Sequence, residues 1–185
     1  MNPNPSNPAI AMQRTHLEGL PAPSIPSGFR LRAFASGDEM RWLALQQASD
    51  RLSVFTPETF QLKFGIDAAA HAARIRFLET DAGEPVATAA AWFDDLYRRP
   101  EFGRVHWVAV HPAYQGRGLS TPLMLAILTL LRERGHGAAY LTTGTARIAA
   151  INLYLKLGFT PWLRDDQERR HWEVIQPALK YPLAL

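Results

Sequence analysis

The stretch "HPAYQGRGLSTPLML", residues 111–125, separates two apolar runs of different character. The run before it, "RVHWVAV" at 104–110, is typical of a mostly buried strand. The run after it places leucine, isoleucine and methionine at helical spacing from Pro122 to about Arg134. The junction itself is crowded with glycine and hydrogen-bonding residues, more of them than a tight turn requires. The stretch therefore predicts a strand, a specialised turn and a helix.

The predicted turn has the features of an anion site. The first turn of a helix presents backbone N–H groups without intrahelical partners, and the helix dipole adds positive charge there. A phosphate satisfies such donors, and glycine lets the backbone approach it closely. Arg117 adds a cation, and Gln115 and Ser120 add hydrogen-bonding groups. The residues alone leave an alternative open, namely a plain strand–helix connection capped by Ser120 or Thr121.

Composition limits the class of protein. The 185 residues, 47% hydrophobic and 20% charged, suit one domain with a sizeable core. The chain has no cysteine, which excludes disulfides, cysteine zinc sites and a thiol nucleophile. The net charge is +3 and the arginines are scattered, so we expect no nucleic-acid partner. No apolar run is long enough for a membrane helix and the N-terminus does not resemble a signal peptide, so we expect a cytoplasmic protein without a membrane partner.

We expect an N-terminal tail followed by a single domain. Residues 1–27 are rich in proline, which predicts an extended or disordered tail. In residues 28–185, strand-like and helix-like patterns alternate, which predicts an α/β sheet of mixed direction. The expected strands are 28–34, 74–80, 86–95, 104–110, 138–143 and 171–177, and the expected helices are 36–50, 56–71, 122–134 and 149–157.

Two sequence motifs, the first at residues 115–120 and the second at 149–159, resemble motifs of a known family. The turn does not fit the P-loop, which needs a lysine, or the dinucleotide fingerprint, which needs a third glycine. The run Gln115-Gly116-Arg117-Gly118-Leu119-Ser120 instead resembles the coenzyme A pyrophosphate loop of the GNAT (N-acetyltransferase) superfamily, Gln/Arg-x-x-Gly-x-Gly/Ala. Further on, "AAINLYLKLGF", residues 149–159, resembles the second hallmark of that superfamily, Ala-Ile-x-Leu-Tyr-x-x-x-Gly-Phe. The resemblance is strongest from 103 to 162.

The resemblance implies both a fold and a reaction. The fold would be a mixed, mostly antiparallel sheet of about six or seven strands flanked by about four helices. The reaction would be direct transfer of an acetyl group from acetyl-CoA to an amine. In this family the pantetheine arm pairs with exposed backbone of a strand, which corresponds to Val108, Ala109 and Val110 here. The pyrophosphate would lie on the N–H groups of 115–120.

Two positions depart from the family pattern. Ser120 stands where glycine or alanine is usual, and serine is small enough to keep the loop. Arg147 stands seven residues before the hallmark tyrosine, where the family often has asparagine that helps to hold the cofactor. An arginine there would reach a phosphate or a carbonyl of the cofactor instead.

The catalytic candidates follow from the same resemblance. Tyr154, the hallmark tyrosine, would protonate the leaving thiolate, and its alternative is a helix residue packing over the core. His106 has an ordinary pKa near 6.5 and shares a strand face with Val108, so it is the candidate base, or else a core histidine. Asp94 and Asp95 would attract a cationic amine, or are a solvated strand end.

Several questions stay open at this point. The aromatic residues Trp92, Trp107, Phe55 and Phe60 would wall an acceptor pocket or simply build the core. A non-catalytic acyl-CoA-binding module is the rival function. The sequence identifies neither the acceptor amine nor the acyl length, and it leaves open whether the chain forms a homodimer.

Overall fold

The computed structural model describes residues 7–93, 99, 101–183 and 185, and within them the chain folds around one sheet. The seven strands lie in the order β2-β3-β4-β5-β6-β1-β7. All neighbouring strands are antiparallel except β5 and β6, which are parallel. The strands are β1 (Ala9–Arg14), β2 (Phe29–Ala33), β3 (Ile75–Thr80), β4 (Pro85–Trp92), β5 (Phe102–Val110), β6 (Ala138–Gly144) and β7 (Thr160–Pro161). The expected mixed, mostly antiparallel α/β architecture is confirmed.

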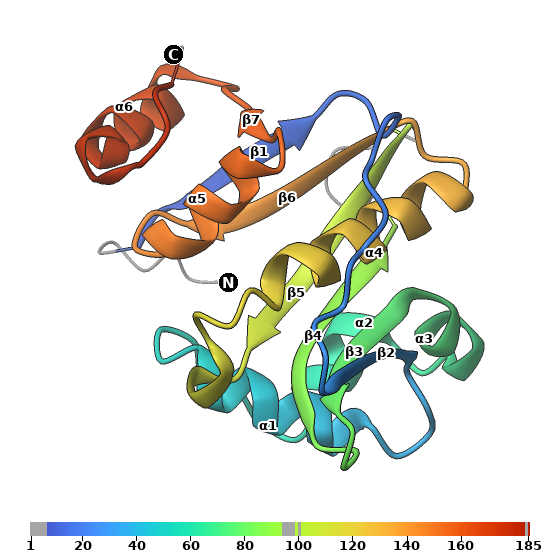
Figure 1. Cartoon of the computed structure of the whole chain (residues 1–185). Helices are drawn as coiled ribbons and strands as arrows, with labels where there is room; N and C mark the ends of the chain where they lie inside the picture. The colour runs from blue at the N-terminus through green and yellow to red at the C-terminus, as the bar shows by residue number, and fades with distance from the viewer. Residues whose placement is uncertain (1–6, 94–98, 100, 184) are drawn as a thin grey trace.

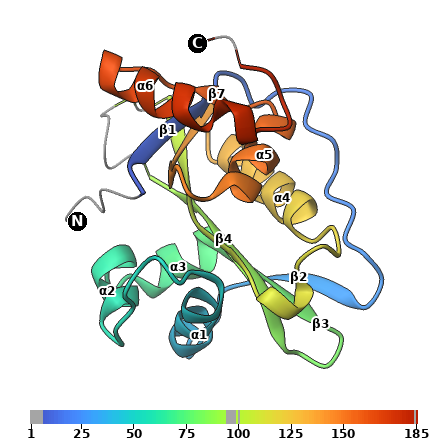
Figure 2. The same cartoon turned by 90° about the vertical axis from the view of Figure 1, so that its left-hand side faces the viewer.

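Helices cover both faces of this sheet. The helices α1 to α3 lie on one face, and α4 and α5 lie on the other (Figures 1 and 2). The helices are α1 (Glu39–Ser49), α2 (Thr59–Phe64), α3 (Ala68–Arg74), α4 (Ser120–Glu133), α5 (Ile148–Lys156) and α6 (Asp166–Ile175). Short 3₁₀ turns follow β5 at Pro112–Tyr114 and α6 at Gln176–Ala178. The part of the chain that is described thus has more helices than the four or so expected.

The two faces of the sheet bury separate cores. Helix α4 packs against β4, whose small residues Ala87, Ala89 and Ala91 let the helix approach closely. The other face buries an aromatic cluster under α1 to α3, with members from both the helices and the sheet. Its fully or almost fully buried aromatic residues are Phe34, Trp42, Phe60, Phe64, Phe77 and Trp92.

The expectation that residues 1–27 form a tail is wrong for Ala9–Arg14. These residues form β1, which pairs with β6 along its whole length and with β7 at Met12 and Gln13. Ile10, Ala11 and Met12 are at most 1% exposed. The run "AIAM" contains no proline, so it keeps every N–H that a central strand must donate. The prolines on either side of this run suggested a tail and hid the short buried strand between them.

The expectation of a final strand at 171–177 is also wrong. Residues 166–175 form helix α6, capped by Asp165, whose carboxylate accepts a hydrogen bond from the N–H of Glu168 at 2.8 Å. The buried residues Glu168, Trp172 and Ile175 have helical spacing. This spacing is apparent only when the acidic residues at the start of the helix, from Asp166, are included in the segment. A second difference is that the helix expected at 56–71 is divided into α2 and α3 at Gly65, which has φ of 70°.

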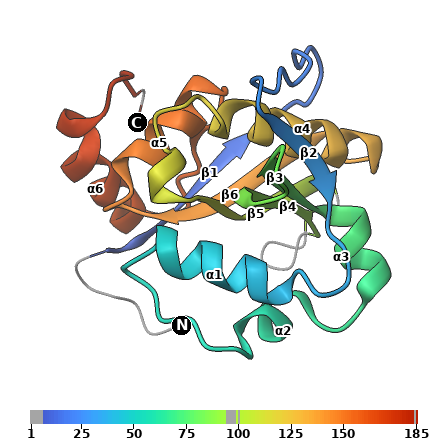
Figure 3. The ribbon, with the colours of Figure 1, turned by 60° about the horizontal axis from the view of Figure 1, so that its bottom comes forward.

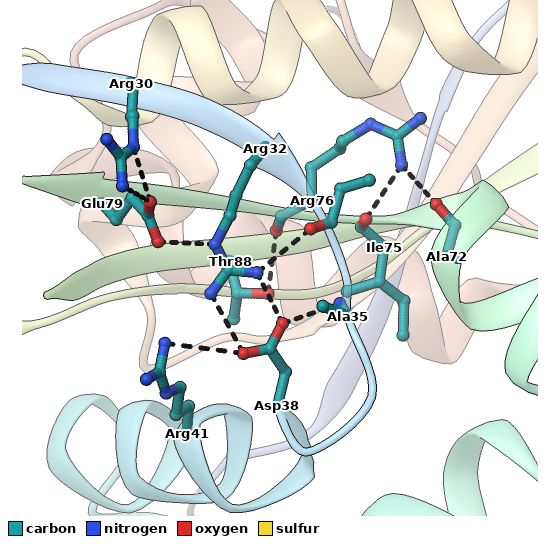
Figure 4. A network of polar contacts seen from close by, with 11 residues as sticks. Arg30, Arg32, Ala35, Asp38, Arg41, Ala72, Ile75, Arg76, Glu79 and Thr88 are labelled. Carbon is teal, nitrogen blue, oxygen red and sulfur yellow. Dashed lines mark hydrogen bonds and ion pairs between the residues drawn. The ribbon is translucent and has the colours of Figure 1, made fainter. Parts of the chain in front are cut away.

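A network of charges fixes the beginning of α1 to the edge of the sheet (Figure 4). Arg32 on β2 binds Glu79 on β3 at 2.5 Å, and it also binds Asp38, the residue before α1, at 2.5 Å. Burial would raise the pKa of both carboxyl groups, but hydrogen bonds from arginine outweigh it and hold each pKa below its ordinary value. Because the network orients α1, it also determines where the far end of that helix meets β5.

Candidate acyl-donor site

The strands β5 and β6 separate partway along their length. Their parallel pairing joins Phe102 to Ala138, Gly103 to Ala139 and Arg104 to Tyr140, and no later pair is formed in the described chain. Strand β6 continues beside β1 as far as Gly144, and β5 continues beside β4 as far as Val110, so each strand keeps its other neighbour while the two part from each other. Figure 1 shows the two strands opening like a V towards their C-terminal ends. The edge of β5 from 105 to 110 is thereby freed from β6.

A bulge in β5 accompanies this divergence. Thr88 of β4 pairs with Ala109, whereas Ala90 pairs with His106, so β5 has one extra residue between these pairs. Trp107 lies in the bulge with φ of 50°, which is unusual for a bulky residue. The side chain of Gln46 on α1 donates a hydrogen bond to the carbonyl of Trp107 at 3.1 Å. The buried side-chain amide of Gln46 therefore stabilises the carbonyl of Trp107, which the bulge removes from the hydrogen-bond ladder.

The three predicted strand residues differ in where their backbone groups point. His111 donates its N–H to Val86 on β4 at 2.8 Å. Because successive residues of a strand point their N–H and C=O groups to opposite sides, Ala109 also faces β4, and Val108 and Val110 face the freed edge. The carbonyl of Val110 accepts hydrogen bonds from Ser49 and Gln115, each at 3.0 Å. Val108 is thus the residue best placed to pair with an extended ligand.

The glycine loop joins this edge to α4. Gly116 and Gly118 have φ of 76° and 77°, and a Cβ added to either would meet nothing within 4 Å. The N–H groups of residues 116–118 have no acceptor among the described residues. Leu119 is 1% exposed and anchors the loop, and Ser120 begins the helix. Glycine is therefore required here for backbone conformation, and the loop presents unpaired donors to open space.

Two side chains of the loop are already engaged. Gln115 donates to the carbonyl of Val110, which closes the loop onto the strand. Arg117 lies over the ring of Tyr114 at 4.9 Å, and the hydroxyl of Tyr114 donates to Glu84 at 2.8 Å. The alternative of a plain connection capped by Ser120 or Thr121 is not what the structure shows, because the cap position is Leu119, which makes no side-chain hydrogen bond. The first turn of α4 keeps its donors available.

Tyr154 lies on the sheet-facing side of α5. It is 6% exposed, and burial raises the pKa of its hydroxyl to about 12, against an opposing effect of Arg147. The hallmark glycine ends this helix: Gly158 has φ of 80°, and Phe159 donates its N–H to the carbonyl of Tyr154 at 3.0 Å. The phenol is therefore fully protonated at neutral pH and held on a rigid helix.

Arg147 is bound to residues at and after the end of α1. It precedes α5 and forms an ion pair with Asp50 at 2.6 Å, with the hydroxyl of Ser53 at 3.4 Å. Asp50 ends α1, the helix that also contributes Gln46 and Ser49. Gln46, Ser49 and Asp50 are spaced three and four residues from Gln46, so they share one face of α1. This spacing is the only feature of the sequence that points to these three residues.

His106 is enclosed by aromatic rings of the cluster under α1 to α3, whereas Val108 packs against the core on the other face. The expectation that the two share a strand face is wrong, because the bulge at Trp107 breaks the alternation. His106 is 9% exposed, with Phe64 and Trp107 rings centred 5.7 and 5.4 Å away. Burial, followed by the charges of Arg104 and Lys63, lowers its pKa well below 6.5, so the imidazole is neutral at pH 7. Asp94 and Asp95, the other expected acceptor-side residues, lie outside the described residues.

Two of the four aromatic candidates belong to the core, and two lie at its edge. Trp92 and Phe60 are almost fully buried, whereas Phe55 and Trp107 are partly exposed at the edge of the same cluster (Figure 3 shows α1 and α2 over this face). Trp107 contacts Trp42 and Phe55 edge-on, at 5.6 and 5.8 Å between ring centres. Phe55 and Trp107 are therefore the members able to line a pocket beside the bulge.

Other kinds of site find little support. In the described residues no group of three or more metal-ligating side chains is close enough to hold an ion, and no helix there could span a membrane. A cavity of about 510 Å³ lies by the edge formed by β2 and β3, and its arginines Arg30 and Arg32 are paired with carboxylates. The separated strands and the glycine loop remain the best candidate site.

Comparison with known proteins agrees with this geometry. The family model described as "Acetyltransferase (GNAT) family" matches residues 38–159. A mycothiol acetyltransferase of Thermobispora bispora is 33% identical over 86% of this chain and 56% of its own length. A mycothiol acetyltransferase of Pseudarthrobacter chlorophenolicus is 35% identical over 79% of this chain and 47% of its own.

A solved structure has the same fold. The GCN5-related N-acetyltransferase from Sphaerobacter thermophilus is 24% identical with a TM-score of 0.67, over 83% of this chain and 48% of that one. This chain thus spans about half the length of these relatives. The family model covers well over half of this chain, from α1 to the end of α5. The chain belongs to the acetyltransferase (GNAT) family.

Proposed function

We propose that this chain transfers an acetyl group from acetyl-CoA directly to an amine of a small molecule or a peptide. The observation that carries the proposal is the freed edge of β5 leading into a loop with unpaired N–H groups. The backbone of Val108 would pair with the pantetheine arm, and residues 116–120 would hold the pyrophosphate. Membership of the GNAT family supports the same donor.

The transfer needs no acyl-enzyme. The amine nitrogen forms a bond to the thioester carbon, and the bond from that carbon to sulfur breaks. The N–H of Val108 would polarise the thioester carbonyl as an oxyanion donor. Tyr154 would supply a hydrogen bond and then a proton to the departing sulfur, and the amine would lose its proton to a base.

His106 is the proposed base, and its lowered pKa makes it a weak one. Its neutral imidazole is ready to accept a proton at pH 7. Because its pKa is lowered, the buried imidazole binds that proton less tightly than an exposed histidine does. We therefore expect His106 to contribute modestly, and Asp94 and Asp95 to attract the cationic amine.

An incubation of acetyl-CoA with a panel of amines tests the proposal. The panel would include the amine precursor implied by the name of the mycothiol acetyltransferases. For amines without a thiol, a thiol reagent reports released CoA without background, because the chain has no cysteine; product mass identifies the others. Binding of CoA with no turnover of any amine would instead favour the rival, a non-catalytic acyl-CoA-binding module. Absence of CoA binding would refute both.

A further inference from the structure

An ion pair joins two distant segments of the chain beside the proposed donor site. The guanidinium of Arg147 lies 2.6 Å from the carboxylate of Asp50 and 3.4 Å from the hydroxyl of Ser53. Asp50 is the residue at which α1 ends, and Arg147 is the residue from which α5 begins. Their side chains are 15% and 34% exposed, so water screens the pair only partly.

Each partner is attached to one of the two separated strands. Ser49, next to Asp50, donates its hydroxyl hydrogen to the carbonyl of Val110 at the end of β5. Arg147 donates its own N–H to the carbonyl of Gly144 at the end of β6. Helices α1 and α5 lie on opposite faces of the sheet (Figure 2). The ion pair therefore spans the gap between the two strands where no ladder hydrogen bond joins them in the described chain.

The same pair is close to the proposed acid. Arg147 lies immediately before α5, and Tyr154 lies within that helix. The positive charge of Arg147 opposes the effect of burial on the pKa of Tyr154. For Asp50, burial would raise the pKa, but hydrogen bonds from Ser53, the N–H of Leu52 and Arg147 outweigh it and lower the pKa. The carboxylate of Asp50 is thus charged at neutral pH.

We infer that Asp50 and Arg147 form a strap across the donor slot, which holds the ends of β5 and β6 at the separation that fits the pantetheine arm of an acyl-CoA. The two are positioning residues, since the strap acts through the backbone of Val108 and through Tyr154. The inference rests on the proposed donor site. Because an unstrapped slot must be ordered when the donor binds, loss of the strap weakens donor binding more than it slows the chemical step.

Charge exchange tests the strap. In Asp50→Arg and Arg147→Asp, like charges face each other, and we expect the Kd for CoA and the KM for acetyl-CoA to rise about tenfold, with kcat reduced less than threefold. The double variant Asp50→Arg/Arg147→Asp restores the attraction and should regain most of the affinity. Arg147→Lys keeps the charge and should lose less than Arg147→Met. Asp81→Asn and Arg132→Gln change exposed charges elsewhere and should bind CoA normally.

The outcomes distinguish a failure of the strap from a failure of the proposed donor site. If wild-type protein binds CoA and the single variants, folded by circular dichroism, bind it equally well or more tightly, the strap is refuted while the donor site stands. A double variant as weak as the sum of the single variants also refutes it. If the wild-type protein itself fails to bind CoA, the donor site is refuted, and the strap across it with it.

Discussion

Tyr154 combines a buried position with a very weak acidity. Its pKa of about 12 lies well above the ordinary thiol pKa of about 8.5, so complete proton transfer to a thiolate is uphill by about 5 kcal/mol. Tyr154 would therefore act chiefly as a hydrogen-bond donor while the carbon–sulfur bond breaks, and the proton would pass on late. We expect Tyr154→Phe to lower kcat by about 10- to 100-fold and to leave the Kd for CoA within twofold. Steady-state kinetics with isothermal titration measure both, and an unchanged kcat would remove Tyr154 from the mechanism.

His106 makes a prediction about stability and pH. Because its folded pKa is depressed, the unfolded chain binds more protons below the ordinary value of about 6.5, and the free energy of unfolding falls as pH falls through that value. We expect urea unfolding to show a loss of about 1 kcal/mol or more between pH 7.5 and 5.5, smaller in His106→Gln. An equal loss in the variant would contradict the assignment.

His106 also makes a prediction about how the reaction rate depends on pH. If His106 is the base, the limb on which activity rises with pH lies below 6.5 and disappears in His106→Gln. We expect a reduction in kcat of about tenfold at pH 7.5, at the low end for a general base, because the imidazole is a weak one. A limb that persists in the variant would assign the base role to another group.

At the scale of elements, the loop before α4 depends on two glycines. An alanine at Gly116 or Gly118 must adopt positive φ, which costs about 1–2 kcal/mol, and a loop that relaxes from this conformation no longer holds its unpaired N–H groups in place. We expect either variant to raise the Kd for CoA by about 10- to 100-fold. Gly135→Ala is the matched control: its φ is 86°, nothing lies within 4 Å, and it follows the other end of α4.

The control separates strain from loss of the site. All three alanine variants should lower Tm by a similar amount, since all three place a side chain at positive φ. Only the two loop variants should lose affinity for CoA. If Gly135→Ala weakens CoA binding equally, the effect is global strain and the loop has no special part in it.

The bulge of β5 depends on a side chain from another element. Gln46→Leu keeps the volume near that of glutamine but leaves the carbonyl of Trp107 without its partner, which costs about 1–3 kcal/mol. We expect lower stability in urea and weaker CoA binding, because the bulge lies within the freed edge of β5. Gln47→Leu removes an exposed hydrogen bond to the carbonyl of Phe55 and should change either quantity by much less. Equal effects of the two variants would contradict a special role for Gln46.

The sequence predicted these elements unevenly, for physical reasons. Helices α4 and α5 and strand β5 have strong periodicity, so their positions were predicted to within a few residues. Strand β1 was missed because its pairing partners lie more than 100 residues away and its flanking prolines suggest a tail. The strap at Asp50 and Arg147 was missed because tertiary structure alone brings the two residues together, and no motif includes both.

At the scale of the whole molecule, the open ends of β5 and β6 divide the sheet into two parts. One part carries β2 to β5 with α1 to α3, and the other carries β6, β1 and β7. Three ladder pairs, helix α4 and the ion pair of Asp50 and Arg147 join them. A ligand that fills the gap would contact both parts, so its binding should stabilise the fold as a unit.

CoA should therefore raise the melting temperature as its concentration rises. A ligand that binds only the folded state adds about 2.7 kcal/mol at 100 times its Kd, which corresponds to a Tm rise of several degrees for a chain of this size. Pantetheine alone reaches the freed edge of β5 but offers no pyrophosphate to the loop, so at equal concentration its shift should be smaller. Gly118→Ala should reduce the shift with CoA and leave the shift with pantetheine unchanged. Equal shifts for both ligands in the wild-type protein would mean that the loop holds no pyrophosphate, and no shift at millimolar CoA would refute the donor site altogether.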